Sequence, residues 1–205
     1  MSEPAPGSAR GPGRPASGAP ERIVEAAFGI LGQDGYAGLT TAKVAAASGQ
    51  NKALISYYFG SKQGLVAAVA RRVSDELVDE VLGGLGEPRR ADELVRGLAD
   101  GVWRAMDHDD RLFRVYFDLA SQSVVEPRVG EILLEMKEGQ RAVLRELLRG
   151  LERPPAKPDI DGVVVFLVAG LEGLALERLE RGETGALRRA RELFISAATV
   201  AIEGR

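Results

Sequence analysis

The sequence predicts an all-α protein of about nine helices. Apolar residues recur at helical spacing along most of the 205-residue chain, for example at Ile23, Ala27 and Leu31. No run alternates apolar and polar residues cleanly with a period of two, and the longest run of β-branched residues covers only 163–165. Glycine, proline and helix-capping residues divide the helical pattern into segments. A mixed fold of helices and strands is therefore disfavoured.

The N-terminal segment differs in composition from the rest of the chain. Residues 1–19 are rich in Pro, Gly, Ala and Ser and have no apolar periodicity, so they cannot bury enough surface to offset the entropy of ordering. We expect a disordered arm here. The first helix follows Pro20, and Gly32 and Gly35 are expected to end it.

Capping residues mark the starts of the next three helices. These residues are Thr40 or Thr41, Asn51 and Ser61. Their side-chain oxygens can accept hydrogen bonds from the free amides of a first helical turn. Gly49 can take the positive φ of a tight turn, and Gly60 can end a helix. We expect a short helix through about residue 47, a second over 51–59 and a long one over 61–82.

Five further helices are expected in the remainder of the chain. They lie near residues 90–106, 109–121, 127–152, 160–181 and 186–203. Segments rich in Pro, Gly or Asp separate them. No internal repeat is visible.

The composition excludes several classes of site. The chain has no cysteine, which excludes disulfides and thiolate ligands, and its one histidine, His108, excludes a multi-histidine metal site. The longest apolar run, 163–169, is too short to cross a bilayer. No glycine-rich phosphate loop follows a strand, and no pair of carboxylates stands out for acid–base chemistry. We expect a cytoplasmic protein that is not an enzyme, with no metal, cofactor or membrane partner.

The net charge of −3 is distributed unevenly. Residues 1–72 carry eight Lys and Arg against four Asp and Glu, whereas residues 73–205 carry 19 against 26. An acidic protein can bind nucleic acid when its basic charge is gathered on one module. The N-terminal part is therefore a candidate for DNA binding, with chance variation in a charged protein as the alternative.

The two short helices have the layout of a helix-turn-helix unit. Such a pair, packed on a first helix, can place its second helix in the major groove. On the helix over 51–59, Ile55 and Phe59 are four residues apart and are expected to face inward. The opposite side carries Lys52, Ala53, Ser56 and Tyr57. These side chains suit phosphate positioning and base reading, with a plain helical hairpin as the alternative.

Several short motifs in residues 21–66 fall in register with those of one family. They are Ile23-Val24, Ala26-Ala27, Gly35-Tyr36, Leu39-Thr40-Thr41, Val44-Ala45, Ala47-Ser48-Gly49, Ser56-Tyr57-Tyr58-Phe59-Gly60-Ser61-Lys62 and Leu65. This region resembles the DNA-binding domain of TetR-family transcriptional regulators. The resemblance implies a helix-turn-helix DNA-binding domain over 20–66 and a helical domain for effector binding and dimerisation over 67–205.

The resemblance also implies contacts of individual residues with a double-stranded DNA operator. Thr41 and Lys62 would bind phosphates, and Tyr58 would lie near the DNA backbone. The residues that would face bases or neighbouring phosphates are Lys52, Ala53 and Tyr57.

The chain departs from the family's pattern at two of the candidate DNA contacts. Gln50 stands where an apolar residue is usual, and it could project from the turn as an extra polar contact. Ser56 stands where a tyrosine is frequent, and its side chain is too short to reach a phosphate as a tyrosine does. Asn51, at the start of the same helix, completes the set of candidate contacts.

Two arginines lie in the N-terminal arm. Arg10 and Arg14 precede the first helix, and arginines in such arms can enter a narrow A·T-rich minor groove. A passive tail is the favoured alternative.

The C-terminal helices are candidates for a homodimer interface. A single recognition helix buries too little surface for tight, specific binding, so we expect a dimer on a palindromic operator. The helix around 163–169 is apolar on every side, which implies a second buried surface, although a fully buried core helix is the alternative. The resemblance implies an interface made by the last two helices. The candidate interface residues are Val164, Phe166, Leu167, Leu171, Leu174, Phe194, Ala198 and Ile202.

The resemblance implies an unidentified small-molecule effector in the C-terminal domain. Most of the remaining aromatic residues lie in the fifth to seventh expected helices, and an aromatic cluster with few polar groups suits a partly apolar ligand. The candidate pocket residues are Trp103, Met106, Phe113, Tyr116, Phe117, Met136 and Phe166. Aromatic residues at helical spacing can equally form a core. We expect His108 to be a solvated residue in a loop between two helices.

By resemblance we expect a repressor that an effector releases from its operator. The effector would tilt the helix over 61–82 and change the spacing of the two recognition helices. The alternative is a helical protein-interaction module that no longer binds specific DNA.

Overall fold

The structure is a computed structural model that describes residues 18–155 and 159–204. The described residues form helices and no strands. The helices are α1 (Ala19–Gly38), α2 (Thr41–Ser48), α3 (Lys52–Phe59), α4 (Lys62–Leu82), α5 (Ala91–His108), α6 (Arg111–Ser123), α7 (Pro127–Arg149), α8 (Ile160–Arg181) and α9 (Gly185–Glu203). The all-α prediction is confirmed. The arm that carries Arg10 and Arg14 lies outside the described residues.

Helix α1 extends further than the sequence predicted. Gly32 lies inside α1, where a Cβ would stand 3.8 Å from side-chain atoms of Arg111 and Val115 on α6. Gly35 breaks the helical path with φ 67° and ψ −177°, and the element continues to Gly38. The predicted end at Gly32 is wrong because Gly32 keeps the helical conformation, and an added Cβ would make only ordinary contacts there, whereas Gly35 takes a backbone conformation that favours glycine.

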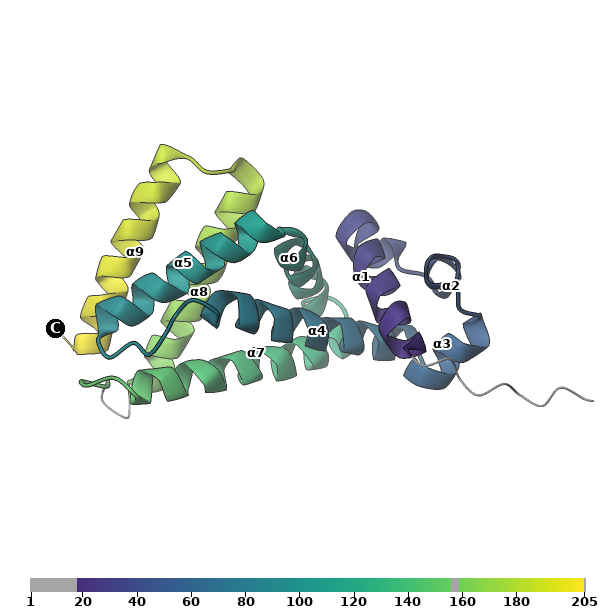
Figure 1. Ribbon diagram of the computed structural model, residues 1–205, viewed down its shortest axis with the longest axis horizontal. Coiled ribbons are helices and arrows are strands. Elements are labelled where there is room, and N and C mark those ends of the chain that lie inside the picture. Colours follow the sequence, from purple (N-terminus) through teal and green to yellow (C-terminus); the bar gives the residue numbers. More distant parts are fainter. Residues whose placement is uncertain (1–17, 156–158, 205) are drawn as a thin grey trace, which may run out of the picture.

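The helices are arranged along one long axis. Figure 1 shows α1, α2 and α3 at one end of the molecule and α8 and α9 toward the other. Helix α4 leaves the α3 end and runs into the larger part beside α7, with which it packs. This single helix crosses the domain boundary that the sequence placed between residues 66 and 67.

Two hydrophobic clusters form the core. The first begins with buried residues of α1, α2 and α3, such as Ile23, Val44 and Ile55, and continues through α4, α5, α6 and α7 to Ala175 of α8. The second joins α5, α7, α8 and α9. The helix-turn-helix end therefore shares one continuous core with the larger part.

Candidate DNA-binding surface and effector cavity

Side-chain caps fix the starts of α2 and α3. The hydroxyl of Thr40 accepts a hydrogen bond from the backbone amide three residues later at 3.2 Å. The carboxamide oxygen of Asn51 does the same at 2.7 Å. Gly49, between the two helices, has φ 66°, the left-handed conformation expected for the turn. Thr40 is thus the cap of α2, and Thr41 is its exposed first residue.

The outer face of α3 is open to solvent. The exposed residues on it are Lys52, Ala53, Ser56 and Tyr57. Tyr57 is 75% exposed, whereas Ile55 on the inner side is 4% exposed. Lys52 forms no hydrogen bond or ion pair with the described residues. This face offers a cation, a small residue and two hydroxyls to an incoming groove.

The next two aromatic residues support Tyr57. Tyr58 is half-buried, and its ring meets the Tyr57 ring edge-on at a centroid distance of 5.2 Å. Phe59 is also half-buried and lies 6.3 Å from the Tyr58 ring. Both pack against the first core cluster. Their packing restricts the directions that the exposed Tyr57 can take.

The polar residues between α2 and α3 are engaged with their own backbone. The side-chain amide of Gln50 donates to the carbonyl oxygen of Ser48 at 3.4 Å, and Gln50 is half-buried. The Gln50 side chain is thus engaged with the backbone of the turn, and its contact with DNA stays a prediction. Asn51 likewise uses its oxygen as the cap of α3.

The junction of α3 and α4 is tightly built. The hydroxyl of Ser61 accepts from the backbone amide of Gly64 at 3.1 Å, which caps α4 as expected. A Cβ at Gly64 would collide with the carbonyl oxygen of Phe59. The start of α4 therefore fixes the direction of α3.

Lys62 is engaged with α1. Its ammonium donates to the carbonyl oxygen of Tyr36 at 2.9 Å and lies 3.9 Å from the centroid of the Tyr36 ring. Burial lowers the pKa of Lys62, and the carboxylates of Asp118 and Glu126 partly oppose this effect. The phosphate contact that the resemblance implies for Lys62 would have to compete with Tyr36.

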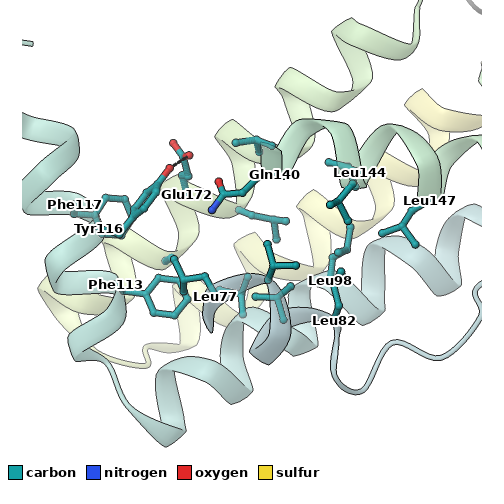
Figure 2. Close-up of a pocket in the computed structure, with 17 residues that line it drawn as sticks. Leu77, Leu82, Leu98, Phe113, Tyr116, Phe117, Gln140, Leu144, Leu147 and Glu172 are labelled. Carbon is teal, nitrogen blue, oxygen red and sulfur yellow. Dashed lines mark hydrogen bonds between the residues drawn. The ribbon is translucent and has the colours of Figure 1, made fainter. Parts of the chain in front are cut away.

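A cavity of about 150 Å³ lies between α4, α5, α6, α7 and α8. Leucine and valine side chains form most of its wall, as Figure 2 shows. Three of the predicted pocket residues line it, and all three are on α6: Phe113, Tyr116 and Phe117. The other four, Trp103, Met106, Met136 and Phe166, are not part of its wall.

Trp103 is held in a polar cluster away from the cavity wall. Its indole N–H donates to Glu183 at 2.8 Å. The guanidinium carbons of Arg178 and Arg191 lie 5.3 and 4.8 Å from its ring. This cluster joins α5 to the connection between α8 and α9, which explains why an aromatic residue at helical spacing does not face the ligand space.

The remaining three predicted pocket residues lie elsewhere in the fold. Met106 and Met136 are both 8% exposed and belong to the first core cluster. Phe166 is 42% exposed on α8, with its ring 5.8 Å from the ring of Phe194 on α9. Helical periodicity does not distinguish a core position from a cavity wall, which is the physical reason for these corrections.

One end of the cavity is polar. The hydroxyl of Tyr116 donates to the carboxylate of Glu172, and the ammonium of Lys137 lies 3.1 Å from the same carboxylate. Burial, followed by the Glu172 charge, raises the pKa of Tyr116, so its phenol stays protonated. Sequence reasoning missed Glu172 and Gln140, which both line the cavity. The signal for Glu172 is that it is the only charge in the otherwise apolar stretch 162–176.

Tyr36 joins the helix-turn-helix end to α6, which also lines the cavity. The backbone amide of Tyr36, next to the break at Gly35, donates to Asp118 on α6 at 2.6 Å. Burial raises the pKa of Asp118, and the Tyr36 amide and Lys62 oppose the rise. Asp118 directly follows the cavity-lining Phe117. No signal in the sequence indicated this pairing.

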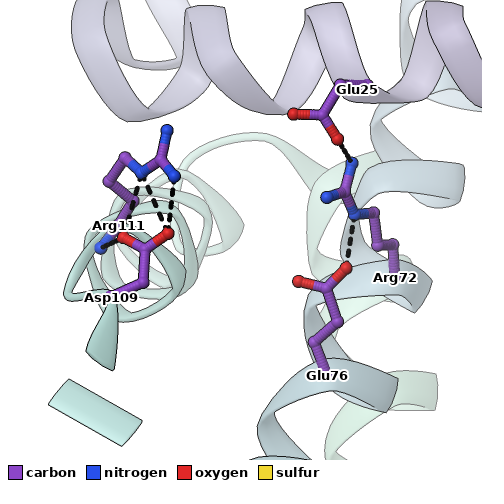
Figure 3. A network of polar contacts seen from close by, with 5 residues as sticks. All are labelled: Glu25, Arg72, Glu76, Asp109 and Arg111. Carbon is purple, nitrogen blue, oxygen red and sulfur yellow. Dashed lines mark hydrogen bonds and ion pairs between the residues drawn. The ribbon is translucent and has the colours of Figure 1, made fainter. Parts of the chain in front are cut away.

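A second set of contacts joins α1 to α4 and α6. Figure 3 shows the guanidinium of Arg72 between the carboxylates of Glu25 and Glu76, at 2.5 and 2.6 Å. The Phe28 ring lies 4.8 Å from the guanidinium carbon of Arg72 and 5.9 Å from that of Arg111 on α6. Helix α1 thus contacts the larger part of the molecule at two places, at Tyr36 and around Glu25 and Phe28.

Half of the predicted interface residues lie in the core of the single chain. Val164, Leu167, Ala198 and Ile202 are each at most 1% exposed. They are covered by the chain's own helices, so they are not available on a surface. The half-buried members of the set are Leu171, Leu174 and Phe194.

An apolar face nevertheless runs along α8 and α9. Its large exposed residues are Val165, Phe166 and Leu176 on α8 and Leu193 and Val200 on α9. Of the predicted interface residues, only Phe166 is fully part of it. One apolar side of α8 thus packs in the chain's own core, and the other is exposed in the single chain.

Other sequence expectations can be placed directly. His108 is exposed and is the last residue of α5, so it lies at a helix end and not within a loop. In the described part of the chain, no group of three or more His, Asp or Glu is arranged to hold a metal ion. None of the helices described is long and apolar enough to span a membrane.

Two family models match the chain. One, described as bacterial regulatory proteins of the tetR family, matches residues 23–69. The other, described as the C-terminal part of the BetI-type transcriptional repressor, matches residues 91–199. Together they cover both the helix-turn-helix end and most of the larger part.

Relatives and solved structures agree with these models. The transcriptional regulator CymR of Pseudomonas putida is 24% identical over 183 residues, which cover 84% of this chain and 89% of that protein. The regulator BetI of Stenotrophomonas maltophilia is 27% identical over 162 residues, covering 76% and 79%. Both are named as transcriptional regulators, which confirms the expectation that the chain is not an enzyme.

The fold recurs in crystal structures. A TetR-family regulator from Rhodococcus sp. superposes with a TM-score of 0.77 at 19% identity, covering 91% of this chain and 99% of that one. A transcriptional regulator from Saccharomonospora viridis in complex with choline gives 0.69 at 19% identity, covering 88% and 95%. The chain belongs to the TetR family of bacterial transcriptional regulators.

Proposed function

We propose that the protein is a repressor that binds a palindromic operator as a homodimer and leaves it when a small molecule binds. The observation that carries this proposal is the open outer face of α3, with Lys52 and Tyr57 free for DNA. The match to the BetI-type repressor model supports repression. The site of action would be the bacterial cytoplasm, where the operator DNA lies.

Base and phosphate contacts would come mainly from α3. The exposed residues proposed for these contacts are Lys52, Ala53, Ser56 and Tyr57, with Thr41 reaching a phosphate from the start of α2. Tyr58 would lie near the DNA backbone while holding Tyr57 in place. Gln50 and Asn51 would contact DNA at the edge of the surface. Their side chains already bond to the protein backbone, so we expect these contacts to be weaker. Lys62 would reach a phosphate only by leaving Tyr36.

The apolar face of α8 and α9 would be covered by a second copy of the chain. A two-fold pair of recognition helices has to read half-sites about 34–36 Å apart, which requires a fixed subunit arrangement. The small residues Gly162, Ala169 and Gly173 of α8 are exposed and lie three or four residues from its large exposed apolar residues. They would let the helices of two subunits approach closely. The face is isologous in such a pair, so each copy covers the other.

Helix α4 would couple the cavity to the DNA-binding surface. Its first turn fixes α3 through Ser61 and Gly64, and its last turns line the cavity with Leu77 and Leu82. A ligand that favours a different tilt of α4 would change the spacing of the recognition helices. The coupling would amount to about 1–3 kcal/mol. The Saccharomonospora viridis regulator was solved in complex with choline, which supports small-molecule binding by a protein of this fold.

The two functional regions therefore share α4. We propose a DNA-binding domain over 20–66 and an effector-binding and dimerisation domain over 67–205, with α4 passing from one to the other.

Selection of bound duplexes from a random DNA pool, at a stated near-physiological salt, tests the proposal. We expect enrichment of a two-fold symmetric motif by the wild type. Tyr57→Ala should alter the motif, whereas the matched change Tyr116→Phe, inside the larger domain, should leave it unchanged. A folded dimer that enriches no motif would contradict the repressor and favour the helical interaction module.

A further inference from the structure

The size of the cavity limits its ligand to one ring. An apolar cavity of about 150 Å³ holds one benzene-sized molecule. Two fused rings would exceed this space unless side chains moved. Because protein interiors are closely packed, such movement is costly.

The chemistry of the wall favours a hydrocarbon ring. Aliphatic side chains of α4, α5, α7 and α8 face the rings of Phe113, Tyr116 and Phe117 (Figure 2). A ring placed among them leaves water for an apolar surrounding and gains the contacts of a closely packed site. Val143, which is 37% exposed, forms part of the wall, so the cavity reaches solvent there.

The charge in the cavity wall is already paired. Glu172 is the only charged residue in the wall, and its carboxylate takes the hydroxyl of Tyr116 and the ammonium of Lys137. Arg141 lies outside the cavity wall, 3.8 Å from Glu138, and its Nε is buried without a hydrogen-bond partner among the described residues. A cationic ligand would have to displace Lys137, and an anionic ligand would meet the carboxylate of Glu172. Either leaves a charge without its partner in a largely buried site, which is unfavourable.

One polar group in the wall lacks a partner. Gln140 forms no hydrogen bond with the described residues. Figure 2 shows its amide between the Tyr116–Glu172 pair and Leu144. An amide offers both a donor and an acceptor, and a hydroxyl group can satisfy either.

We infer that the cavity binds an uncharged, single-ring compound with one hydroxyl group, which pairs with the amide of Gln140. This inference rests on the proposed role of the cavity as the effector site. The volume of the cavity selects a single ring. The Glu172–Lys137 pair disfavours charged analogues. The hydrogen bond with Gln140 favours a hydroxylated ring over the bare hydrocarbon.

Calorimetric titration of the full-length protein without DNA tests this inference. Five probes test the effects of the hydroxyl group, of charge and of ring size separately. They are 4-methylphenol, toluene, 4-methylbenzoate, 4-methylbenzylammonium and 2-naphthol. We expect 4-methylphenol to bind at least about tenfold more tightly than toluene and the two ions, as one satisfied hydrogen bond or one avoided buried charge requires. We expect the same preference over 2-naphthol, because its second ring exceeds the space.

Three variants assign the preference to residues. In Gln140→Leu, 4-methylphenol and toluene should bind within about threefold of each other, because the hydrogen bond is gone. In Glu172→Gln, Lys137 loses its counterion, so 4-methylbenzoate should become the tightest probe. Glu131→Gln, an exposed change elsewhere on α7, should keep the wild-type order. Circular dichroism checks that each variant is folded.

The outcomes separate this inference from the proposed function. Tightest binding of either ion or of 2-naphthol by the wild type, or saturable binding of none of the probes, would overturn the inference. An unchanged order in Gln140→Leu would also overturn it. Because the titration contains no DNA, 4-methylphenol binding together with failure of the duplex selection would overturn the repressor proposal alone.

Discussion

The backbone amide of Tyr36 and the carboxylate of Asp118 lie 2.6 Å apart, although 82 residues separate them in the sequence. The carbonyl oxygen of the same Tyr36 accepts from Lys62 at 2.9 Å. One residue of α1 is thus bonded to the start of α4 and to α6. Since α6 also lines the cavity, a displacement of α6 by a ligand would act on α1 through this residue.

Removing the Asp118 carboxylate should weaken the fold. Asp118→Ala leaves the Tyr36 amide without its acceptor, and we expect the free energy of unfolding to fall by about 1–2 kcal/mol. Urea unfolding measures the change. The control is Asp34→Ala, which breaks an exposed ion pair with Lys43 and should cost less than about 0.5 kcal/mol. Equal losses in the two variants would contradict a special role for Asp118.

The pH dependence of stability should also report on Asp118. Its pKa is raised in the folded state, so the folded protein binds this proton more tightly than the unfolded chain. The resulting stabilisation is present below the ordinary aspartate pKa of about 4 and is lost as the pH rises through the raised value. The unfolding free energy of the wild type minus that of Asp118→Asn should therefore decrease over this window. A difference that stays constant across a pH series of urea titrations would refute the assignment.

Two lysines should respond differently in DNA binding. Lys52→Ala should reduce the steepness of log affinity against log salt by about 0.9 for a non-specific duplex, as loss of one phosphate contact predicts. Its stability should be unchanged, because Lys52 has no partner among the described residues. Lys62→Ala should instead lose about 0.5–1.5 kcal/mol of stability with its hydrogen bond to Tyr36.

The control for the salt series is a cation far from α3. Arg153→Ala removes an exposed positive charge just beyond α7 and should leave the slope unchanged. The same fall in slope for Arg153→Ala and Lys52→Ala would indicate a diffuse charge effect and not a contact of α3 with phosphate.

Packing of α4 against α5 depends on one glycine. A Cβ at Gly101 would collide with the carbonyl oxygen of Val81, so Gly101→Ala should cost about 1–3 kcal/mol or more of stability. At Gly139 no atom lies within 4 Å of the added Cβ, and Gly139→Ala should stabilise α7 by about 0.5–1 kcal/mol. Thermal or urea unfolding decides between these opposite signs.

The apolar face of α8 and α9 should control subunit association. Val165→Asp places a charge in this face and should convert the proposed dimer to a helical monomer in sedimentation equilibrium. Val125→Asp is the matched control, because Val125 is 74% exposed in the connection between α6 and α7. A Val165→Asp protein that stays dimeric would place the interface elsewhere.

The elements with local signals were the ones that sequence reasoning predicted well. Asn51 and Ser61 cap helices through bonds to amides three residues away, and Gly49 adopts a positive φ. These features depend on neighbours in the chain, so composition and spacing reveal them. The open face of α3 follows in the same way from the four-residue spacing of Ile55 and Phe59.

The features that sequence reasoning missed depend on contacts between distant segments. The Tyr36–Asp118 bond and the Tyr116–Glu172 bond join residues 82 and 56 positions apart, and no local pattern encodes them. The sides of α8 illustrate another limit. When all sides of a helix are apolar, periodicity cannot tell which side faces its own core, so Val164, predicted for the interface, lies in the core.

The position of the single tryptophan has a consequence for spectroscopy. Trp103 contacts Glu183, Arg178 and Arg191. Its fluorescence emission therefore reports on the junction between α5 and the connection from α8 to α9. Far-ultraviolet dichroism averages over all helices. Since a continuous core extends from α1 to α8, the two signals should change at the same denaturant concentration. A helical signal that falls while the emission stays native would mean that the DNA-reading end melts first.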